Sequence, residues 1–199
     1  MADTMPRIPY LREEVEIPPG VQVEVRQENN NLIVKVKGPM GEIEKNFGFV
    51  PLLAHVEDGK VVLETYFAKK FEKALIGTIA ARIRNMIQGV TKGWRYKLKI
   101  VYSHFPIMVK VQGDKLVIEN FLGRKDKIIL DIPKGVKVQV TKDDIIVEGI
   151  DRDIVSQFAA NIEEATTLRG DERPCPHGRE GGPGVLDGIY VYAVEPIKK

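Results

Sequence analysis

The sequence predicts an α+β protein built from two tandem related domains, each a mostly antiparallel β-sheet packed with one α-helix. First, the segment IPPGVQVEV at residues 17–25 recurs as IPKGVKVQV at residues 132–140. Second, segments of alternating apolar residues precede a helical periodicity twice along the chain. Third, 199 residues suit two domains of about 100 residues each. We therefore expect one domain at residues 1–92 and another at residues 93–199.

The repeat extends beyond its first motif. Each copy is followed by a β-branched segment that ends in glycine, at residues 32–38 and 145–149, and AARI at residues 80–83 matches AANI at residues 159–162. An ordered series of three matches indicates duplication of a common plan.

The first domain is predicted to contain strands followed by a helix. Valines alternate with polar residues at 21–25, and a polar turn separates this strand from residues 32–37, which predicts a hairpin. Further strands are expected at residues 43–49 and 61–64. A helix is expected over residues 69–88, with Gly89 as its C-cap. Its apolar face is expected to consist of Phe71, Leu75, Ile79, Ile83, Met86 and Val90.

The second domain is predicted to begin with a strand at residues 94–102, whose aromatic face we assign to the core. Strands are also expected at residues 107–111, 116–119, 128–132, 136–140 and 145–149, with a basic loop at residues 120–127. A helix is expected over residues 151–168, with Asp151 or Asp153 as its N-cap. Its expected apolar residues are Ile154, Phe158, Ile162 and Ala165. Residues 169–184, dense in Gly and Pro, predict a long loop before a last strand at residues 185–194.

The composition excludes a membrane-embedded class. No apolar run approaches the roughly 20 residues that span a bilayer, and the N-terminal residues lack the pattern of a signal peptide. A single cysteine, Cys175, excludes an intramolecular disulfide framework. We expect a cytoplasmic protein with no membrane partner.

Positive charge is concentrated in the middle of the chain. The net charge is only +2, but residues 82–127 contain 11 basic and three acidic side chains, a surplus of eight. Such a segment favours a polyanionic partner, because phosphates neutralised by Lys or Arg release their counterions. A solvated basic face that serves solubility is the alternative.

The residues show no coherent catalytic or metal centre. Cys175 and His177 lie two residues apart, but a structural zinc site needs four ligands, and only His55 and His104 remain as further histidines. The glycine-rich run at residues 178–184 lacks the Gly-Lys-Ser/Thr ending of a P-loop. We expect no enzyme, no metal and no cofactor.

Four features together resemble a known family. They are the duplicated IPxGVxVxV unit, the basic end of the first helix, the SHFP corner at residues 103–106, and DGIYV at residues 187–191. This set, covering residues 10–195, is similar to large-subunit ribosomal protein L6 in its archaeal and eukaryotic form. The family has a basic residue and a Phe shortly before the DGIY motif, where Pro183 and Val185 stand here, and Val194 stands at the basic position that follows; residues 170–184 look like an enlarged loop.

The resemblance implies a structural constituent of the large ribosomal subunit. Its implied partners are large-subunit rRNA close to the sarcin-ricin loop, neighbouring large-subunit ribosomal proteins, and the translational GTPases that dock nearby. Carried to this sequence, the implied rRNA contacts are Arg124, Lys125, Lys127, Arg169, Arg173, Arg179, Lys198 and Lys199. The basic segment adds Arg82, Arg84, Lys92, Arg95, Lys97 and Lys99 as RNA-binding candidates.

Two other classes of function stay open on the sequence. A free-standing adaptor would use the two domains to join two protein partners, and it predicts exposed apolar patches and little salt dependence of binding. An enzyme using Cys175 and His177 is the other class.

Overall fold

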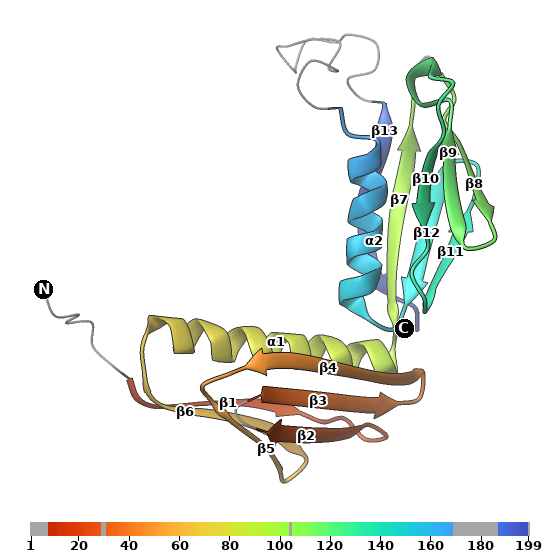
Figure 1. Ribbon diagram of the computed structural model, residues 1–199. Coiled ribbons are helices and arrows are strands. Elements are labelled where there is room, and N and C mark those ends of the chain that lie inside the picture. Colours follow the sequence, from red (N-terminus) through yellow and green to blue (C-terminus); the bar gives the residue numbers. More distant parts are fainter. Residues whose placement is uncertain (1–7, 29–30, 104, 169–186, 199) are drawn as a thin grey trace, which may run out of the picture. The chain divides into compact units, whose positions relative to one another are not determined.

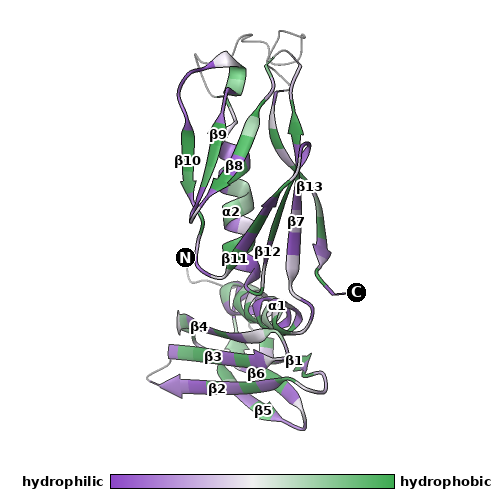
Figure 2. Ribbon diagram, turned by 90° about the vertical axis from the view of Figure 1, so that its right-hand side faces the viewer, coloured by the Kyte–Doolittle hydropathy of each residue, from purple (hydrophilic) through white to green (hydrophobic). Residues whose placement is uncertain are grey.

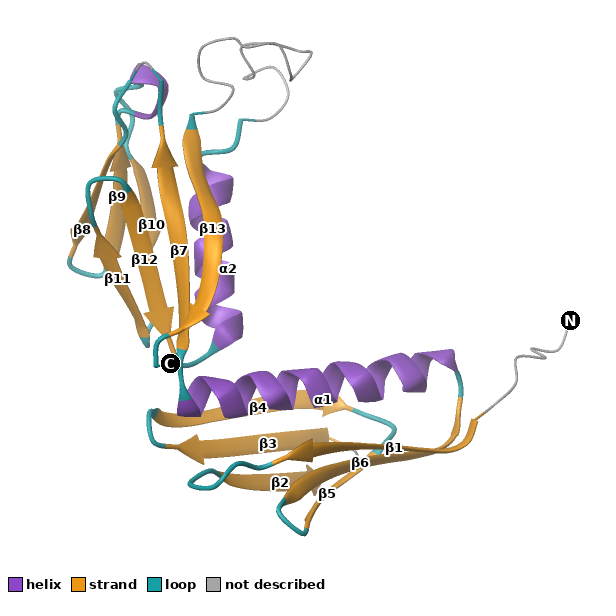
Figure 3. Cartoon of the chain, turned by 180° about the vertical axis from the view of Figure 1, so that it is seen from behind, coloured by secondary structure: helices purple, strands orange, loops and turns teal. Residues whose placement is uncertain are grey.

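A computed structural model of the chain describes residues 8–28, 31–103, 105–168 and 187–198. The chain forms two compact units, Met1–Lys92 and Gly93–Lys199. In each unit a long α-helix lies along a set of antiparallel strands, as Figures 1 and 3 show. The α+β class predicted from the sequence is confirmed.

The first unit contains two three-stranded sheets and one helix. The sheets have the strand orders β1-β6-β5 and β2-β3-β4, and all their pairings are antiparallel. The elements are β1 (Ile8–Glu16), β2 (Gln22–Glu28), β3 (Asn31–Gly38), β4 (Gly41–Phe49), β5 (Leu53–Glu57), β6 (Lys60–Ala68) and α1 (Lys70–Thr91).

The core of the first unit lies between its sheets and α1. Leu32, Val34 and Val36 alternate along β3 with half-buried residues and are fully buried, while Ile79 and Ile83 of α1 lie in the same core. Figure 2 shows hydrophobic and hydrophilic segments alternating along the strands. The predicted hairpin is confirmed, since β2 pairs with β3 from Gln22↔Lys37 to Glu28↔Asn31.

The second unit contains a four-stranded and a three-stranded sheet. Their orders are β11-β12-β7-β13 and β10-β9-β8, again with antiparallel pairing throughout. The elements are β7 (Trp94–Val101), β8 (Met108–Gln112), β9 (Lys115–Glu119), the 3-10 turn η1 (Phe121–Gly123), β10 (Ile128–Asp131), β11 (Val136–Val140), β12 (Asp144–Gly149), α2 (Arg152–Ala165) and β13 (Gly188–Pro196).

The aromatic face of β7 belongs to the core, as predicted. Trp94, Tyr96, Leu98 and Ile100 are buried and pack in one cluster with residues of α2. Tyr102 lies beyond the end of β7 and is 41% exposed. The rings of Trp94 and Tyr96 are therefore unavailable for stacking on bases.

The predicted apolar faces of the helices need correction at one end of each. Phe71 is 66% exposed because the buried stripe of α1 begins only at Ile76. In α2 the buried positions are Val155, Phe158, Ala159 and Ile162, so Ile154 is 40% exposed.

The helix ends also differ in part from the prediction. Gly89 is not the C-cap, because α1 continues to Thr91 and the left-handed turn falls at Gly93, whose φ is 72°. The N-cap of α2 is Asp151, and its Oδ1 accepts a hydrogen bond from the backbone N–H of Asp153 at 3.0 Å. Of the two predicted N-cap candidates, the structure therefore selects Asp151.

Two strands, β1 and β5, were not predicted: charged residues interrupt the apolar alternation of β1, and β5 has only five residues, most of them exposed. In β1 the pairing with β6 is reinforced by ion pairs instead: Lys60 Nζ lies 2.8 Å from Glu14 Oε2, and Arg12 Nη1 lies 3.8 Å from Glu64 Oε1. Such pairs form between two strands, so they leave no alternation of apolar and polar residues in the sequence of either strand alone.

The duplication is real, but the recurring IPxGVxVxV motif does not mark equivalent strands. By topology β2-β3-β4 corresponds to β8-β9-β10, and β1-β6-β5 corresponds to β7-β12-β11, with β13 added. The motif begins β2 in one unit and β11 in the other, which occupy different sheets. The AARI and AANI matches do lie in equivalent elements, α1 and α2.

Candidate nucleic-acid interface

The predicted basic loop of the second unit, residues 120–127, has an unusual backbone. Asn120, Leu122 and Gly123 adopt φ values of 62°, 53° and 71°, all in the left-handed region. Asn and Gly tolerate this region, but a leucine there is strained. The strain lies next to the three basic side chains Arg124, Lys125 and Lys127, all of which are exposed.

A hydrogen bond to Pro106, a hydrogen bond within the loop and one buried ring hold this loop. Asn120 Nδ2 donates a hydrogen bond to the carbonyl of Pro106 at 3.0 Å, and the backbone N–H of Arg124 donates to the carbonyl of Phe121 at 3.0 Å. The Phe121 ring is buried in the core. A small cavity of about 90 Å³ between the loop and the end of α2 is lined by Phe121, Arg124, Asp126, Ile128, Ala165, Thr167 and Leu168.

The same end of the unit holds the beginning of β13. Asp187 is buried, and its Oδ1 accepts from the backbone N–H of Ser103 at 2.8 Å. Thr166 Oγ1, just after α2, accepts from the backbone N–H of Ile189 at 2.9 Å. Leu168 and Asp187 therefore both lie at the end of the unit that carries the basic loop.

Several predicted contacts fall outside the described residues. They are Arg169, Arg173, Arg179 and Lys199, together with Cys175, His177 and the loop of residues 170–184. In sequence the three arginines lie between Leu168 and Asp187. Lys198 is described and is exposed just after β13.

One carboxylate moderates the charge beside the loop. Glu119 lies between two lysines, with Oε1 2.8 Å from Lys127 Nζ and Oε2 3.3 Å from Lys110 Nζ. Hydrogen bonds from Lys127 and then Lys110 lower the pKa of Glu119 below its ordinary value. Sequence reasoning missed this residue.

The basic face of β7 is brought against carboxylates from neighbouring strands. Arg95 Nε lies 2.5 Å from Glu148 Oε1 of β12, and Lys97 Nζ lies 2.6 Å from Glu195 Oε1 of β13. Lys99 Nζ lies 3.4 Å from Asp144 Oδ1. These three acids lie outside the basic segment in the sequence, so they offset part of its surplus of eight in the folded unit.

Of the RNA-binding candidates in the first unit, Arg84 is ion-paired with a carboxylate, whereas Arg82 and Lys92 differ from it. Arg84 Nη2 is paired with Glu13 Oε1 at 2.5 Å. Arg82 and Lys92 are exposed, and within the described part of the chain neither has an ion-pair partner. An open groove of about 770 Å³ is lined by residues of both charges, among them Glu14, Glu16, Arg84 and Lys92.

In the ranges that the structure describes, no three His, Cys, Asp or Glu side chains are grouped so that they could hold a metal ion. Neither of the described helices has an apolar stretch long enough for a bilayer.

The fold and this site define a class: a duplicated α+β protein whose second domain presents an exposed basic loop. Comparison with known sequences is more specific. The family described as Ribosomal protein L6 matches residues 17–93 and again residues 105–171. The chain belongs to this family, as the sequence resemblance predicted.

Archaeal relatives match over almost their whole length. The chain is 59% identical over 194 residues to large ribosomal subunit protein uL6 of Pyrobaculum aerophilum, covering 96% of this chain and 99% of that protein. It is 50% identical to large ribosomal subunit protein uL6 of Aeropyrum pernix over 189 residues, covering 94% and 97%. For the protein of the same description from Saccharolobus solfataricus the values are 44% over 193 residues, 96% and 99%.

The two family matches agree with the topological equivalence of the units. They begin at residues 17 and 105, just before β2 and β8, so the family's own repeat aligns these two strands. The motif at residues 132–140 is therefore a second, internal similarity rather than the start of the second copy.

Proposed function

We propose that this protein is a structural constituent of the large ribosomal subunit that binds large-subunit rRNA through the basic end of its second unit. Membership of the ribosomal protein L6 family supports the subunit assignment, and this is a family of ribosomal proteins rather than of enzymes. The single observation that carries the RNA contact is the strained, anchored loop with exposed Arg124, Lys125 and Lys127.

The proposed mechanism is recognition of shape. A-form RNA presents phosphates and 2′-hydroxyls on a wide minor groove, which Lys and Arg contact without reading bases. A loop that is already ordered loses little conformational entropy on binding. The anchored backbone at residues 120–124 fits this requirement.

The finer location follows the resemblance. We place the contact close to the sarcin-ricin loop, with neighbouring large-subunit proteins and docking translational GTPases nearby. Chemical probing of reconstituted subunits tests this location. Protection of that rRNA region by the wild-type chain supports it, and protection confined to other helices contradicts it.

Substitution of the loop tests the RNA contact itself. We expect Arg124→Gln/Lys125→Gln/Lys127→Gln to weaken binding to a large-subunit rRNA fragment. The slope of log affinity against log salt should become shallower by about 0.7–0.9 for each phosphate that the variant no longer neutralises. Nitrocellulose filter binding over a range of salt concentrations measures both quantities.

The matched control removes two lysines of β7, outside the loop, that are each ion-paired as Lys127 is with Glu119. Lys97→Gln/Lys99→Gln eliminates two charges that are paired with Glu195 and Asp144, so we expect little change in affinity or slope. Equal reductions of affinity in both variants would show that the loop has no special role.

One observation favours a second candidate, the protein adaptor. The first unit exposes several large apolar side chains, including Tyr66, Phe67 and Phe71, as an adaptor would. The two functions differ in salt dependence, because apolar contacts lack the steep decline of affinity with salt that phosphate contacts produce. Sedimentation with large subunits at rising salt separates them.

A further inference from the structure

The first unit has an exposed surface in which aromatic rings and lysines are combined. The rings are Tyr10, Tyr66, Phe67 and Phe71, with exposed fractions of 45%, 56%, 66% and 66%, and the lysines are Lys69, Lys70 and Lys73, all exposed. We call these seven residues the aromatic–lysine surface. Large exposed apolar patches on a folded domain commonly mark sites of interaction.

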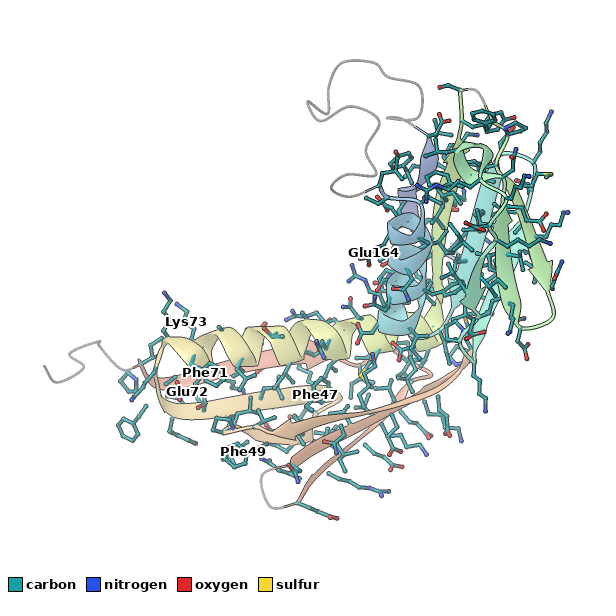
Figure 4. All side chains as sticks on the ribbon, turned by 45° about the horizontal axis from the view of Figure 1, so that its top comes forward. Phe47, Phe49, Phe71, Glu72, Lys73 and Glu164 are labelled. Atoms are coloured by element: carbon teal, nitrogen blue, oxygen red, sulfur yellow. The ribbon has the colours of Figure 1, made fainter. Side chains whose placement is uncertain are left out.

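Strand register and chain continuity bring these residues to the same end of the first unit. Tyr10 of β1 is the direct partner of Tyr66 in β6, and their ring centroids are 5.3 Å apart. β6 ends at Ala68, and α1 begins two residues later with Phe71 in its first turn. Figure 4 shows Phe71, Glu72 and Lys73 together at the start of this helix.

The exposed rings are held in place without being part of the core. The Tyr10 hydroxyl donates a hydrogen bond to Glu64 Oε1 at 2.6 Å. Phe67 has a φ of 52°, a strained conformation for a bulky residue, and its side chain is still two-thirds exposed. Strain without burial indicates a role other than packing.

Three lysines outnumber the two carboxylates beside them, Glu64 and Glu72, and both carboxylates are hydrogen-bonded within the first unit. Glu72 Oε2 accepts the backbone N–H of Lys69 at 2.9 Å, and Glu64 holds the Tyr10 hydroxyl. The lysines lie at the positive end of the α1 dipole, where cations disfavour the helix. Helix stability therefore does not explain them.

We propose that the aromatic–lysine surface binds unpaired RNA nucleotides, with bases stacked on the rings and phosphates contacting Lys70 and Lys73. Exposed rings beside cations are how proteins bind single-stranded nucleic acid without sequence preference. The inference rests on the proposed function, which makes RNA the partner, but it assigns a second contact on the other unit. An acidic or apolar protein segment is the competing occupant.

The test uses the full chain, a labelled oligouridine and an RNA duplex of the same length. We expect Tyr66→Ala/Phe71→Ala to weaken oligouridine binding at least about fivefold, as removal of a stacked base predicts, and to leave duplex binding unchanged. Lys70→Gln/Lys73→Gln should lower the salt slope by about 0.7 for each lysine that contacts a phosphate. Thermal unfolding of the lysine variant should not occur at a lower temperature, since its helix dipole is better matched.

A matched control is Tyr192→Ala. This ring is 55% exposed on β13, which also carries Glu195, the ion-pair partner of Lys97, so its removal should leave oligouridine binding unchanged. Unchanged oligouridine binding by Tyr66→Ala/Phe71→Ala overturns the proposal. If that variant also fails to enter large subunits, the surface binds a protein instead.

The two proposed RNA contacts can be tested independently of each other. Arg124→Gln/Lys125→Gln/Lys127→Gln should weaken binding to the rRNA fragment and retain oligouridine binding by the first unit. Normal rRNA binding by this triple variant contradicts the proposed function alone, whereas absence of oligouridine binding by it contradicts the surface proposed here.

Discussion

At the scale of single residues, the loop of residues 120–124 combines a strained backbone with contacts that fix its conformation. A non-glycine residue in the left-handed region costs about 1–2 kcal/mol. Leu122 bears this cost, while the buried ring of Phe121 and the hydrogen bond from Asn120 to Pro106 hold the turn. The neighbouring cations are thereby presented on an ordered backbone.

Gly123 allows a direct test of this strain. Its φ is 71°, and a Cβ there would lie 3.0 Å from the Phe105 ring. We expect Gly123→Ala to lower the free energy of unfolding by more than about 1 kcal/mol, combining backbone strain with the steric contact. Gly113→Ala is the control, because its φ is 59° with no atom within 4 Å, so it reports strain alone. Chemical denaturation measures both, and equal destabilisation would exclude a contribution from the Phe105 ring.

Glu119 gives a pH-dependent prediction. Its pKa is lowered in the folded state by Lys127 and Lys110, so its contribution to stability is present above its unfolded pKa of about 4.3 and disappears as the pH falls through the lower folded value. Glu119→Gln should therefore be less stable than wild type at pH 7 and equally stable at strongly acidic pH. Denaturation across this range tests the sign.

The same variant should bind rRNA more tightly, because Lys127 is no longer paired with a carboxylate. If Lys127 then contacts a further phosphate, the salt slope steepens by about 0.7–0.9. Weaker binding would mean that Glu119 positions Lys127 for RNA rather than competing with it.

The charge pairings show which part of the site could be predicted from sequence. A count along residues 82–127 locates the basic loop, because its cations are neighbours in the chain. It cannot show that Glu148 and Glu195 neutralise Arg95 and Lys97, since those contacts arise only when β12 and β13 pair with β7.

At the scale of elements, each unit places a strand-terminal glycine against its helix. A Cβ on Gly38 would lie 2.7 Å from Val90 Cγ2 of α1, and one on Gly149 would lie 2.6 Å from Val155 Cγ2 of α2. Both glycines close the β-branched segments that the sequence repeat paired. Here glycine provides close approach of strand and helix rather than a positive φ.

Overpacking at this contact should be destabilising. We expect Gly149→Ala to cost about 1–3 kcal/mol, because the added methyl meets both Val155 and the carbonyl of Gly135 at 3.0 Å. Gly77→Ala, in the exposed part of α1 with no atom within 4 Å, should instead stabilise by up to about 1 kcal/mol. Opposite signs in thermal denaturation confirm the contact, and two stabilising substitutions would contradict it.

Strands were predicted correctly where the sequence of the strand itself alternates between apolar and polar residues. Alternation along β2, β3 and β7 predicts strands whose inner faces are buried, as observed for Val34 and Leu98. β1 depends on partners in β6, such as Lys60 for Glu14, which no local pattern reveals. Strand order also depends on contacts between strands rather than on the sequence of one segment. The motif shared by β2 and β11 could therefore suggest duplication, but it could not identify which strands are equivalent.

At the scale of the whole molecule, each unit has a core of its own. Ile83 of α1 and Ile162 of α2 occupy matching positions of the repeat and are both fully buried, each among residues of its own unit. We propose that the boundary at residues 92 and 93 separates two cooperative folding units, as expected where each has a separate hydrophobic core.

A matched pair of cavity substitutions tests this division in the full chain. Ile83→Ala and Ile162→Ala should each cost about 2–5 kcal/mol in the unit that carries them, because each leaves a cavity at a fully buried position. Native-state hydrogen exchange resolves the effect by region. Ile83→Ala should lower the protection of amides in β3 and β6 while those of β7 and β12 keep theirs, and Ile162→Ala should do the reverse. If either substitution lowers protection equally throughout the chain, the two units unfold together. The basic loop and the aromatic–lysine surface would then depend on the same free energy of unfolding.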